Sequence, residues 1–148
     1  MKTVVQRVSS AKVEIKGEET RGIGQGLMVL LGVADGDTDE DLQYIVRKVS
    51  GLRIFDDDNG VMNRSVTDIG GEMLLVSQFT LLADTKKGNR PSYVEAGDPA
   101  AANMMYEKAI GEFRSRGIPV KTGTFGAEMK VSLVNEGPVT IIIDSRRK

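Results

Sequence analysis

The chain has 148 residues, of which 40% are hydrophobic and 28% are charged, and its net charge is −1. This composition is typical of one globular domain, covering residues 1–148, and excludes a disordered, fibrous or lipid-embedded chain. Because the sequence contains neither Cys nor His, it also excludes disulfides, iron–sulfur clusters, thiolate- or imidazole-bound zinc, and nucleophiles that depend on Cys or His.

The first residues lack the long apolar centre of a signal peptide. No run in the sequence approaches the ~20 apolar residues that span a bilayer. We therefore expect a cytoplasmic protein without a membrane partner. As a separate expectation, the protein needs neither a metal nor another cofactor.

Short segments rich in β-branched residues predict strands in the first third of the chain. They cover residues 4–8 and 12–16, separated by Ser9 and Ser10, and the apolar run LMVLLGV, which we expect to be buried on both faces. The preceding GIGQG has the glycines of a phosphate-binding loop, but it leads into a strand and lacks a following Lys-Ser or Lys-Thr. We interpret it as a turn.

The first helix is predicted to begin at Asp37 and Thr38, with Glu40 three residues after Asp37 in the spacing of a capping box. Apolar residues then recur at offsets of three and four, on one helix face: Leu42, Ile45, Val46, Val49 and Leu52. Gly51 is expected to end this helix. The following RIF and VMN predict two short strands joined by DDDNG, whose spacing is that of a hairpin turn rather than a calcium loop.

Residues 72–82, EMLLVSQFTLL, predict a long apolar strand, and a loop with clustered cations follows it. Asp98 and Pro99 have the N-cap and first-turn chemistry of a second helix. The apolar face of that helix comprises Ala102, Met105, Tyr106, Ala109, Ile110 and Phe113, and Gly117 and Pro119 end it. The last strands are expected at residues 120–124, 129–134 and 139–144. These elements predict one α+β domain with about eight or nine strands and two long helices on one face of the sheets.

Two stretches carry polar or unusual residues inside predicted strands. Ser77, Gln78 and Thr80 interrupt an apolar strand, either as satisfied buried groups or as parts of a site. NEGPVT, residues 135–140, is either a plain hairpin or a functional loop. Its proline cannot donate to a strand ladder, so the pairing breaks there and backbone carbonyls are left free.

Together, SQFTL and NEGPVT resemble the two signature motifs of the D-aminoacyl-tRNA deacylases. The similarity extends in order through QRV, GLMVLLGV, LRIF, GVMN, RPS and TGTFGAEMKVSLVNEGPVT, and so covers essentially the whole chain. Each fragment alone is weak, but their order and spacing make the resemblance specific.

This resemblance implies a homodimer of three-layer β/β/α subunits with active sites at the subunit interface. In this family the Gly-Pro bond is cis, so Gly137 and Pro138 of one subunit would enter the pocket around Ser77 to Thr80 of the other. The substrate would be D-aminoacyl-tRNA, or glycyl-tRNA, and the products a free amino acid and tRNA. The Gly-Pro carbonyls would hold the ammonium group and exclude an L side chain.

The resemblance also suggests a role for each candidate site residue. Ser77, Gln78, Phe79 and Thr80 would form the catalytic stretch, with Gln78 and Phe79 holding the terminal adenosine, although Phe79 is equally interpretable as a core residue. The chiral filter would comprise Gly137, Pro138, Phe125, Met129 and Arg7, although an exposed strand arginine is an equal interpretation of Arg7. The tRNA contacts would be Lys86, Lys87 and Arg90, which by composition alone indicate only a solvated surface. We expect no DNA partner.

Thr80 is the obvious nucleophile, but the motif offers it no base. We therefore favour the hypothesis that the 2′-hydroxyl of the terminal ribose helps to activate water, while N–H groups near Phe79 and Thr80 stabilise the oxyanion. Two alternatives stay open. One is a small-molecule esterase that uses Thr80 directly, and the other is a non-catalytic RNA-binding or assembly module.

Overall fold

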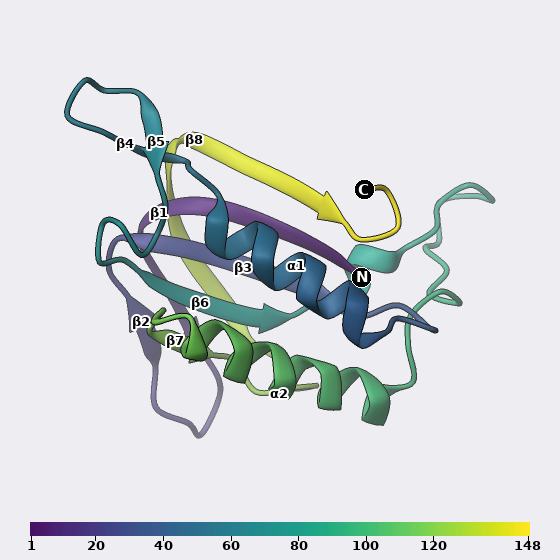
Figure 1. Ribbon diagram of the computed structural model, residues 1–148. Coiled ribbons are helices and arrows are strands. Elements are labelled where there is room, and N and C mark those ends of the chain that lie inside the picture. The colour runs from purple at the N-terminus through teal and green to yellow at the C-terminus, as the bar shows by residue number, and fades with distance from the viewer.

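The computed structural model describes residues 1–148 and contains eight strands, two α-helices and one 3-10 helix (Figure 1). In chain order the elements are β1 (Lys2–Glu14), β2 (Arg21–Ile23), β3 (Gly26–Gly32), α1 (Asp39–Gly51), β4 (Phe55–Asp56), β5 (Met62–Arg64), β6 (Glu72–Ser77), η1 (Phe79–Leu82), α2 (Pro99–Ser115), β7 (Val120–Thr122) and β8 (Lys130–Asp144). The predicted α+β class and the two long helices are confirmed. Neither helix is both long enough and apolar enough to cross a membrane.

Six strands form one mixed sheet, and β4 and β5 form a separate hairpin. Residues 2–8 of β1 pair with β3 and residues 11–13 pair with β2, while β8 runs antiparallel to β1 along nearly its whole length. β6 is parallel to both β3 and β7. β1 therefore pairs with three strands, β2, β3 and β8.

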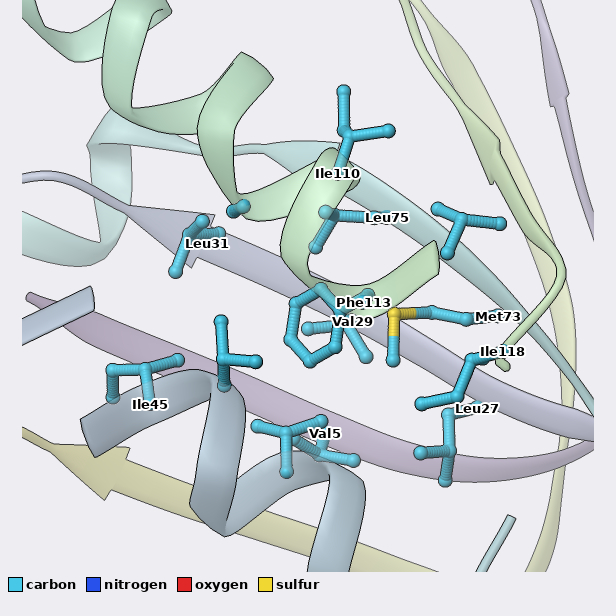
Figure 2. Packing of buried hydrophobic residues seen from close by; sticks show 14 of the residues in the cluster. Val5, Leu27, Val29, Leu31, Ile45, Met73, Leu75, Ile110, Phe113 and Ile118 are labelled. Carbon is cyan, nitrogen blue, oxygen red and sulfur yellow. The ribbon is translucent and has the colours of Figure 1, made fainter. Parts of the chain in front are cut away.

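Apolar clusters on both faces of β3 and β6 give the fold its three layers. Both helices cover one face, where Ile110 and Phe113 of α2 pack over Val29 and Leu75 (Figure 2). The other face is buried against the far halves of β1 and β8 and against β2, in a cluster formed by Val8, Ala11, Val13, Ile23, Met28, Leu74 and Val76, with Leu133 at its edge. The prediction that LMVLLGV is buried on both faces is confirmed.

Three predicted strand boundaries are wrong, each because the strand pairs differently from what local sequence indicates. β1 continues through Ser9 and Ser10, and the expected break is only a pair of register shifts against β8. The two last predicted strands are one strand, β8. The strand predicted over residues 72–82 ends at Ser77, because its partner β3 ends at Gly32 and offers nothing further to pair with.

The helix caps show one correction and one confirmation. Thr38, not Asp37, caps α1, and Asp41 rather than Glu40 completes the capping box by accepting from the Thr38 N–H at 2.9 Å. That N–H is the main reason why the pKa of Asp41 is lowered to about 2. At α2, Asp98 caps the helix as predicted by accepting from the Ala101 N–H at 3.1 Å.

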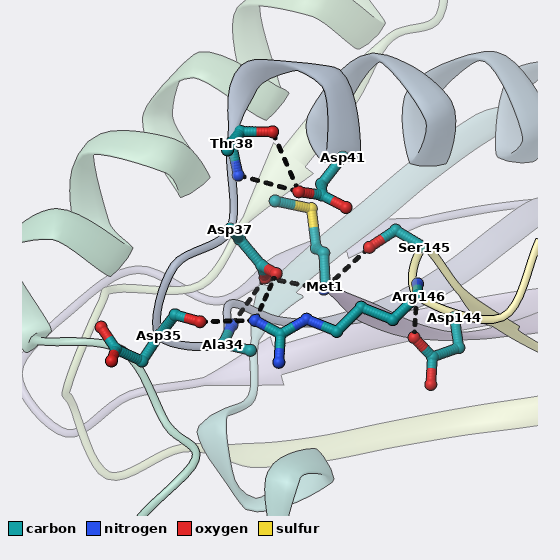
Figure 3. Close-up of polar contacts among 9 residues, drawn as sticks. All are labelled: Met1, Ala34, Asp35, Asp37, Thr38, Asp41, Asp144, Ser145 and Arg146. Atoms are coloured by element: carbon teal, nitrogen blue, oxygen red, sulfur yellow. Dashed lines mark hydrogen bonds and ion pairs between the residues drawn. The ribbon is translucent and has the colours of Figure 1, made fainter.

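Asp37 is instead the centre of a buried ionic cluster (Figure 3). Its carboxylate lies 2.7 Å from the Met1 ammonium, and both groups are fully buried. The carboxylate also accepts from the Ala34 N–H at 2.7 Å and lies 3.2 Å from the Arg146 guanidinium, while the ammonium donates to Ser145 Oγ at 2.9 Å. This cluster ties the start of β1 to the segments that precede α1 and follow β8.

Replacing Asp37 by Asn should lower the free energy of unfolding by about 3 kcal/mol, because it leaves a buried ammonium without its counter-charge. Urea denaturation measures this loss. The matched control is Asp39→Asn, since Asp39 pairs with Lys108 at 2.6 Å on the surface and its loss should cost less than ~1 kcal/mol. Equal losses from the two substitutions would contradict the assignment.

Candidate active site

A cavity of about 580 Å³ lies at the C-terminal end of β6. Its walls come from the end of β6 and the start of η1, from residues 93–97, from the start of α2 and from residues 125–131. Ten of the 15 lining residues are hydrophobic, and no Asp, Glu, Lys or Arg is among them. The site therefore suits a ligand that is largely apolar or aromatic, held by a few polar groups.

The first wall contains three of the four residues that the sequence predicts to be catalytic. Ser77, Gln78 and Phe79 line the cavity, while Thr80 lies one residue further on η1 and is half-buried. The side-chain amide of Gln78 donates to Thr80 Oγ1. Phe79 is 57% exposed, which overturns the alternative that it is a core residue.

A neighbouring wall is held by hydrogen bonds to the backbone of β6. Gly123 donates its N–H to the Leu75 carbonyl at 3.4 Å, and the Tyr106 hydroxyl donates to the same carbonyl at 2.7 Å. Burial raises the pKa of Tyr106 to about 12, so this hydroxyl stays a donor. The Tyr106 ring lies 6.2 Å from that of Phe125, and Phe125 and Met129 both line the cavity. The structure thus places these two predicted residues in the same cavity as Ser77 and Gln78.

Arg21 is a positioning residue that sequence reasoning missed. Its guanidinium donates to the carbonyls of Thr122 and Gly123 at 2.9 and 3.1 Å and to the Thr124 hydroxyl at 3.3 Å, and it pairs with Glu18 at 2.5 Å. These contacts fix the segment that leads directly into the wall at Phe125. No local motif marks this role, since the contacts span about a hundred residues of sequence.

Replacing Arg21 by Met should speed amide hydrogen exchange in residues 123–127 at least about tenfold, because it removes three hydrogen bonds from a charged group, and one such bond alone contributes about 1.5 kcal/mol. Exchange followed by mass spectrometry measures this change. The control is Arg64→Met, which removes an exposed guanidinium that pairs with Asp58 and should leave the same peptides unchanged. Unchanged exchange in the Arg21 variant would contradict the role of Arg21.

The NEGPVT segment forms a bulge within β8, here called the Gly-Pro bulge (residues 136–139). Gln6 pairs with Thr140 and Val8 pairs with Asn135, so four residues of β8 lie opposite Arg7 alone. The Gly137–Pro138 peptide bond is cis. The Asn135 amide closes the base of the bulge by donating to the carbonyls of Arg7 and Val139, at 3.1 and 3.0 Å.

The side chain of Arg7 holds this bulge by a hydrogen bond to its backbone. Its side chain is only 12% exposed, which overturns the alternative of an exposed strand arginine. The guanidinium donates to the Glu136 carbonyl at 3.1 Å and to the Ile54 carbonyl at 2.7 Å, and it lies 3.6 Å from Asp56. Arg7 therefore binds the carbonyl that precedes Gly137, and not the carbonyl of Gly137 or Pro138.

The structure does not bring all the predicted site residues together within one chain. Gly137 and Pro138 are exposed, and neither they nor Arg7 line the cavity. Lys86, Lys87 and Arg90 are exposed on a loop. The segment that follows this loop contributes Tyr93, Ala96 and Gly97 to the lining of the cavity. No group of three or more acidic residues is arranged to hold a metal ion, and DDDNG is a hairpin turn in which Asp57 accepts from the N–H groups of Asn59 and Val61.

Comparison with known proteins agrees with the resemblance of the two motifs. The family model described as D-Tyr-tRNA(Tyr) deacylase matches residues 4–144. This chain belongs to that family. Within the deacylase family, it is 57% identical to a D-aminoacyl-tRNA deacylase of Parabacteroides distasonis, over 100% of this chain and 99% of the relative. It is 52% identical to one of Desulfitobacterium hafniense, over 99% of each.

Solved structures agree with the deacylase fold. One described as "c-Myc DNA Unwinding Element Binding Protein" is 42% identical and superposes with a TM-score of 0.92, over 97% of this chain and 98% of that one. A second, described as "Structural Analysis of a probable eukaryotic D-amino acid tRNA deacylase", is 19% identical, with a TM-score of 0.82 over 96% and 97% of the two chains. At that identity the second likeness concerns the fold alone.

Proposed function

We propose that this chain hydrolyses the ester bond of D-aminoacyl-tRNA to a free D-amino acid and tRNA. The observation that carries the proposal is the cavity itself. In a member of the deacylase family, it joins Ser77, Gln78 and Phe79 to the wall containing Phe125 and Met129. Its volume of about 580 Å³ is in the range of pockets that hold one small ligand, such as a terminal aminoacyl-adenosine. Since the substrate is tRNA, we place the reaction in the cytoplasm.

The chiral filter of this proposal is the Gly-Pro bulge of a second subunit, in a homodimer. Two observations support the proposal. The bulge is exposed and does not line the cavity of its own chain, and β8 carries an exposed apolar residue on either side of it, namely Val134 and Ile142. Exposed apolar residues on one strand are typical of a surface that another chain covers.

The bulge would discriminate by exclusion rather than by attraction. Free carbonyls from Gly137 and Pro138 hold the substrate ammonium and occupy the volume that an L side chain needs. A D side chain extends toward solvent, so its type matters little. Glycine has no Cβ, so glycyl-tRNA is also accepted, as expected of a filter that only excludes a side chain in the L position.

Catalysis in this proposal relies on the substrate, since no carboxylate or amine lines the cavity. The 2′-hydroxyl of the terminal ribose helps to activate water. The N–H groups of Phe79 and Thr80 begin a helix and therefore lack intrahelical acceptors, and they stabilise the oxyanion. An aminoacyl ester is already activated, so orientation and exclusion of water supply much of the remaining acceleration.

The deciding experiment incubates the protein with the D- and L-forms of one aminoacyl-tRNA, with and without a chelator. We expect rapid loss of the D-form, survival of the L-form and no effect of the chelator. Undiminished D-aminoacyl-tRNA would favour a non-catalytic RNA-binding module. Hydrolysis of simple D-amino acid esters at a similar kcat/KM would favour a small-molecule esterase.

The three cations Lys86, Lys87 and Arg90 are the proposed contacts to the tRNA backbone. If they neutralise three phosphates of a single strand, the affinity for tRNA should fall about 20-fold between 50 and 200 mM salt. Anisotropy titrations of labelled tRNA measure this slope, and Lys86→Gln should reduce it. A slope unchanged by that substitution would contradict the contact, and competition by duplex DNA would contradict our expectation of no DNA partner.

A further inference from the structure

The mouth of the cavity carries two aromatic rings. Phe79 and Tyr93 are the only exposed residues among the seven aromatics of the chain, at 57% and 37%. Their ring centroids lie 5.0 Å apart with an interplanar angle of 69°, an edge-to-face contact. Such a contact fixes the orientation of both rings and still leaves aromatic surface open to a ligand. The deacylation chemistry gives Tyr93 no role.

Tyr93 is held in place because the loop that precedes it is closed at its base. Asp84 and Ser92 exchange two backbone hydrogen bonds, of 2.8 and 2.9 Å. The residues after Tyr93 are also fixed, since Glu95 accepts from the Asp35 N–H and Gly97 donates to the Val33 carbonyl, both at 3.0 Å. The ring therefore has a defined position beside the cavity, whereas the tip of the loop extends away from the sheet (Figure 1).

The closed loop also carries the three exposed cations. Lys86, Lys87 and Arg90 all lie between Asp84 and Ser92, so positive charge and an exposed ring are presented by one short segment. Cations that follow a phosphate backbone, with aromatic rings on which bases stack, are the combination by which proteins bind single-stranded nucleic acid. The 3′ end of tRNA is such a single strand.

We propose that Tyr93 is a stacking surface for the nucleobase that precedes the terminal adenosine. This inference rests on the proposed function, which places the terminal aminoacyl-adenosine inside the cavity. The rest of the strand must then leave past the mouth, between Tyr93 and the cations. The next base along the strand is the one that meets the exposed ring. Because every base has a π-face, this contact favours a polynucleotide over a small ester without selecting a sequence.

The test measures the Kd of an uncharged acceptor-stem RNA hairpin by fluorescence anisotropy, and so does not need the enzyme to be active. One hairpin is intact and the other lacks the penultimate base. Tyr93→Leu should weaken binding of the intact hairpin about tenfold, the range expected when one base loses its stacking partner. Tyr93→Phe keeps the ring and should bind like the wild type. The abasic hairpin should bind the wild type and Tyr93→Leu equally weakly.

Two outcomes would overturn the inference. One is a loss on Tyr93→Leu that is equal for the intact and abasic hairpins, because Tyr93 would then act through the fold or through another nucleotide. The other is a wild type that binds both hairpins equally well. Failure of the wild type to hydrolyse D-aminoacyl-tRNA while these Kd values behave as expected would instead remove the proposed function and leave the nucleobase contact standing.

Discussion

A D-aminoacyl-tRNA that ends in 2′-deoxyadenosine should be hydrolysed with a kcat/KM about a hundredfold or more below that of the normal substrate. The reason is that the cavity contains no carboxylate and no amine, and that the sequence has no His or Cys. Activation of water then falls to a hydroxyl of the substrate, and a positioned group that takes part in proton transfer contributes about 10²–10⁴-fold. Single-turnover assays of the two substrates measure the ratio directly.

The matched protein variant is Thr80→Ala, which should retain kcat/KM within about tenfold of the wild type. Thr80 lies beyond the lining of the cavity and its hydroxyl accepts from Gln78, so it has no base to make it a nucleophile. A normal rate with the 2′-deoxy substrate would contradict substrate assistance. So would an acyl ester trapped on Thr80.

Replacing Gly137 by Ala should reduce kcat/KM for D-aminoacyl-tRNA about a hundredfold, the loss expected when a binding surface moves by about 1 Å. Gly137 has a φ of +124°, which side chains rarely adopt, and a Cβ there would lie 2.7 Å from Arg7 Nη2 and 2.8 Å from Val139 Cγ2. Arg7 cannot yield freely, because it also holds the carbonyls of Glu136 and Ile54. The bulge must therefore move.

Gly17→Ala is the control for this substitution. Gly17 also has a positive φ, of +81°, but a Cβ there meets nothing within 4 Å, so it introduces backbone strain without displacing a neighbour. We expect it to keep near-normal activity. Both variants should be compared with the wild type by urea denaturation, so that a loss of folding is not taken for a loss of the site. A folded, fully active Gly137→Ala that still spares L-aminoacyl-tRNA would contradict the role of the bulge.

Local chemistry was sufficient to predict the elements whose ends are fixed by their own residues. Asp98 and Pro99 mark the start of α2. The Asn-Gly of DDDNG marks the turn between β4 and β5, where Gly60 has a φ of +73°. Such features can be predicted from the sequence because the residue that ends an element lies within a few positions of the backbone groups that it caps or turns.

Features that depend on partners far away in the sequence could not be predicted in this way. The polar residues at 77–80 indicated that something interrupts the apolar run, but the strand ends there because β3 ends opposite it. Likewise, Pro138 predicted broken pairing. The support of the bulge by Arg7, 129 residues away from Glu136, follows only from the pairing of β1 with β8. The cavity and the role of Arg21 likewise depend on contacts between residues that are far apart in the sequence.

Mixing two inactive variants tests most directly whether the Gly-Pro bulge of one subunit completes the cavity of the other. One variant is Gly137→Ala, and the other carries Gln78→Ala with Phe79→Ala. In a twofold dimer with sites completed across the interface, each mixed dimer has one site with both defects and one with none. Equal co-expression should therefore restore about a quarter of wild-type activity, since half of the dimers are mixed. No recovery in purified mixed dimers would show that bulge and cavity act within one chain, and would contradict this account.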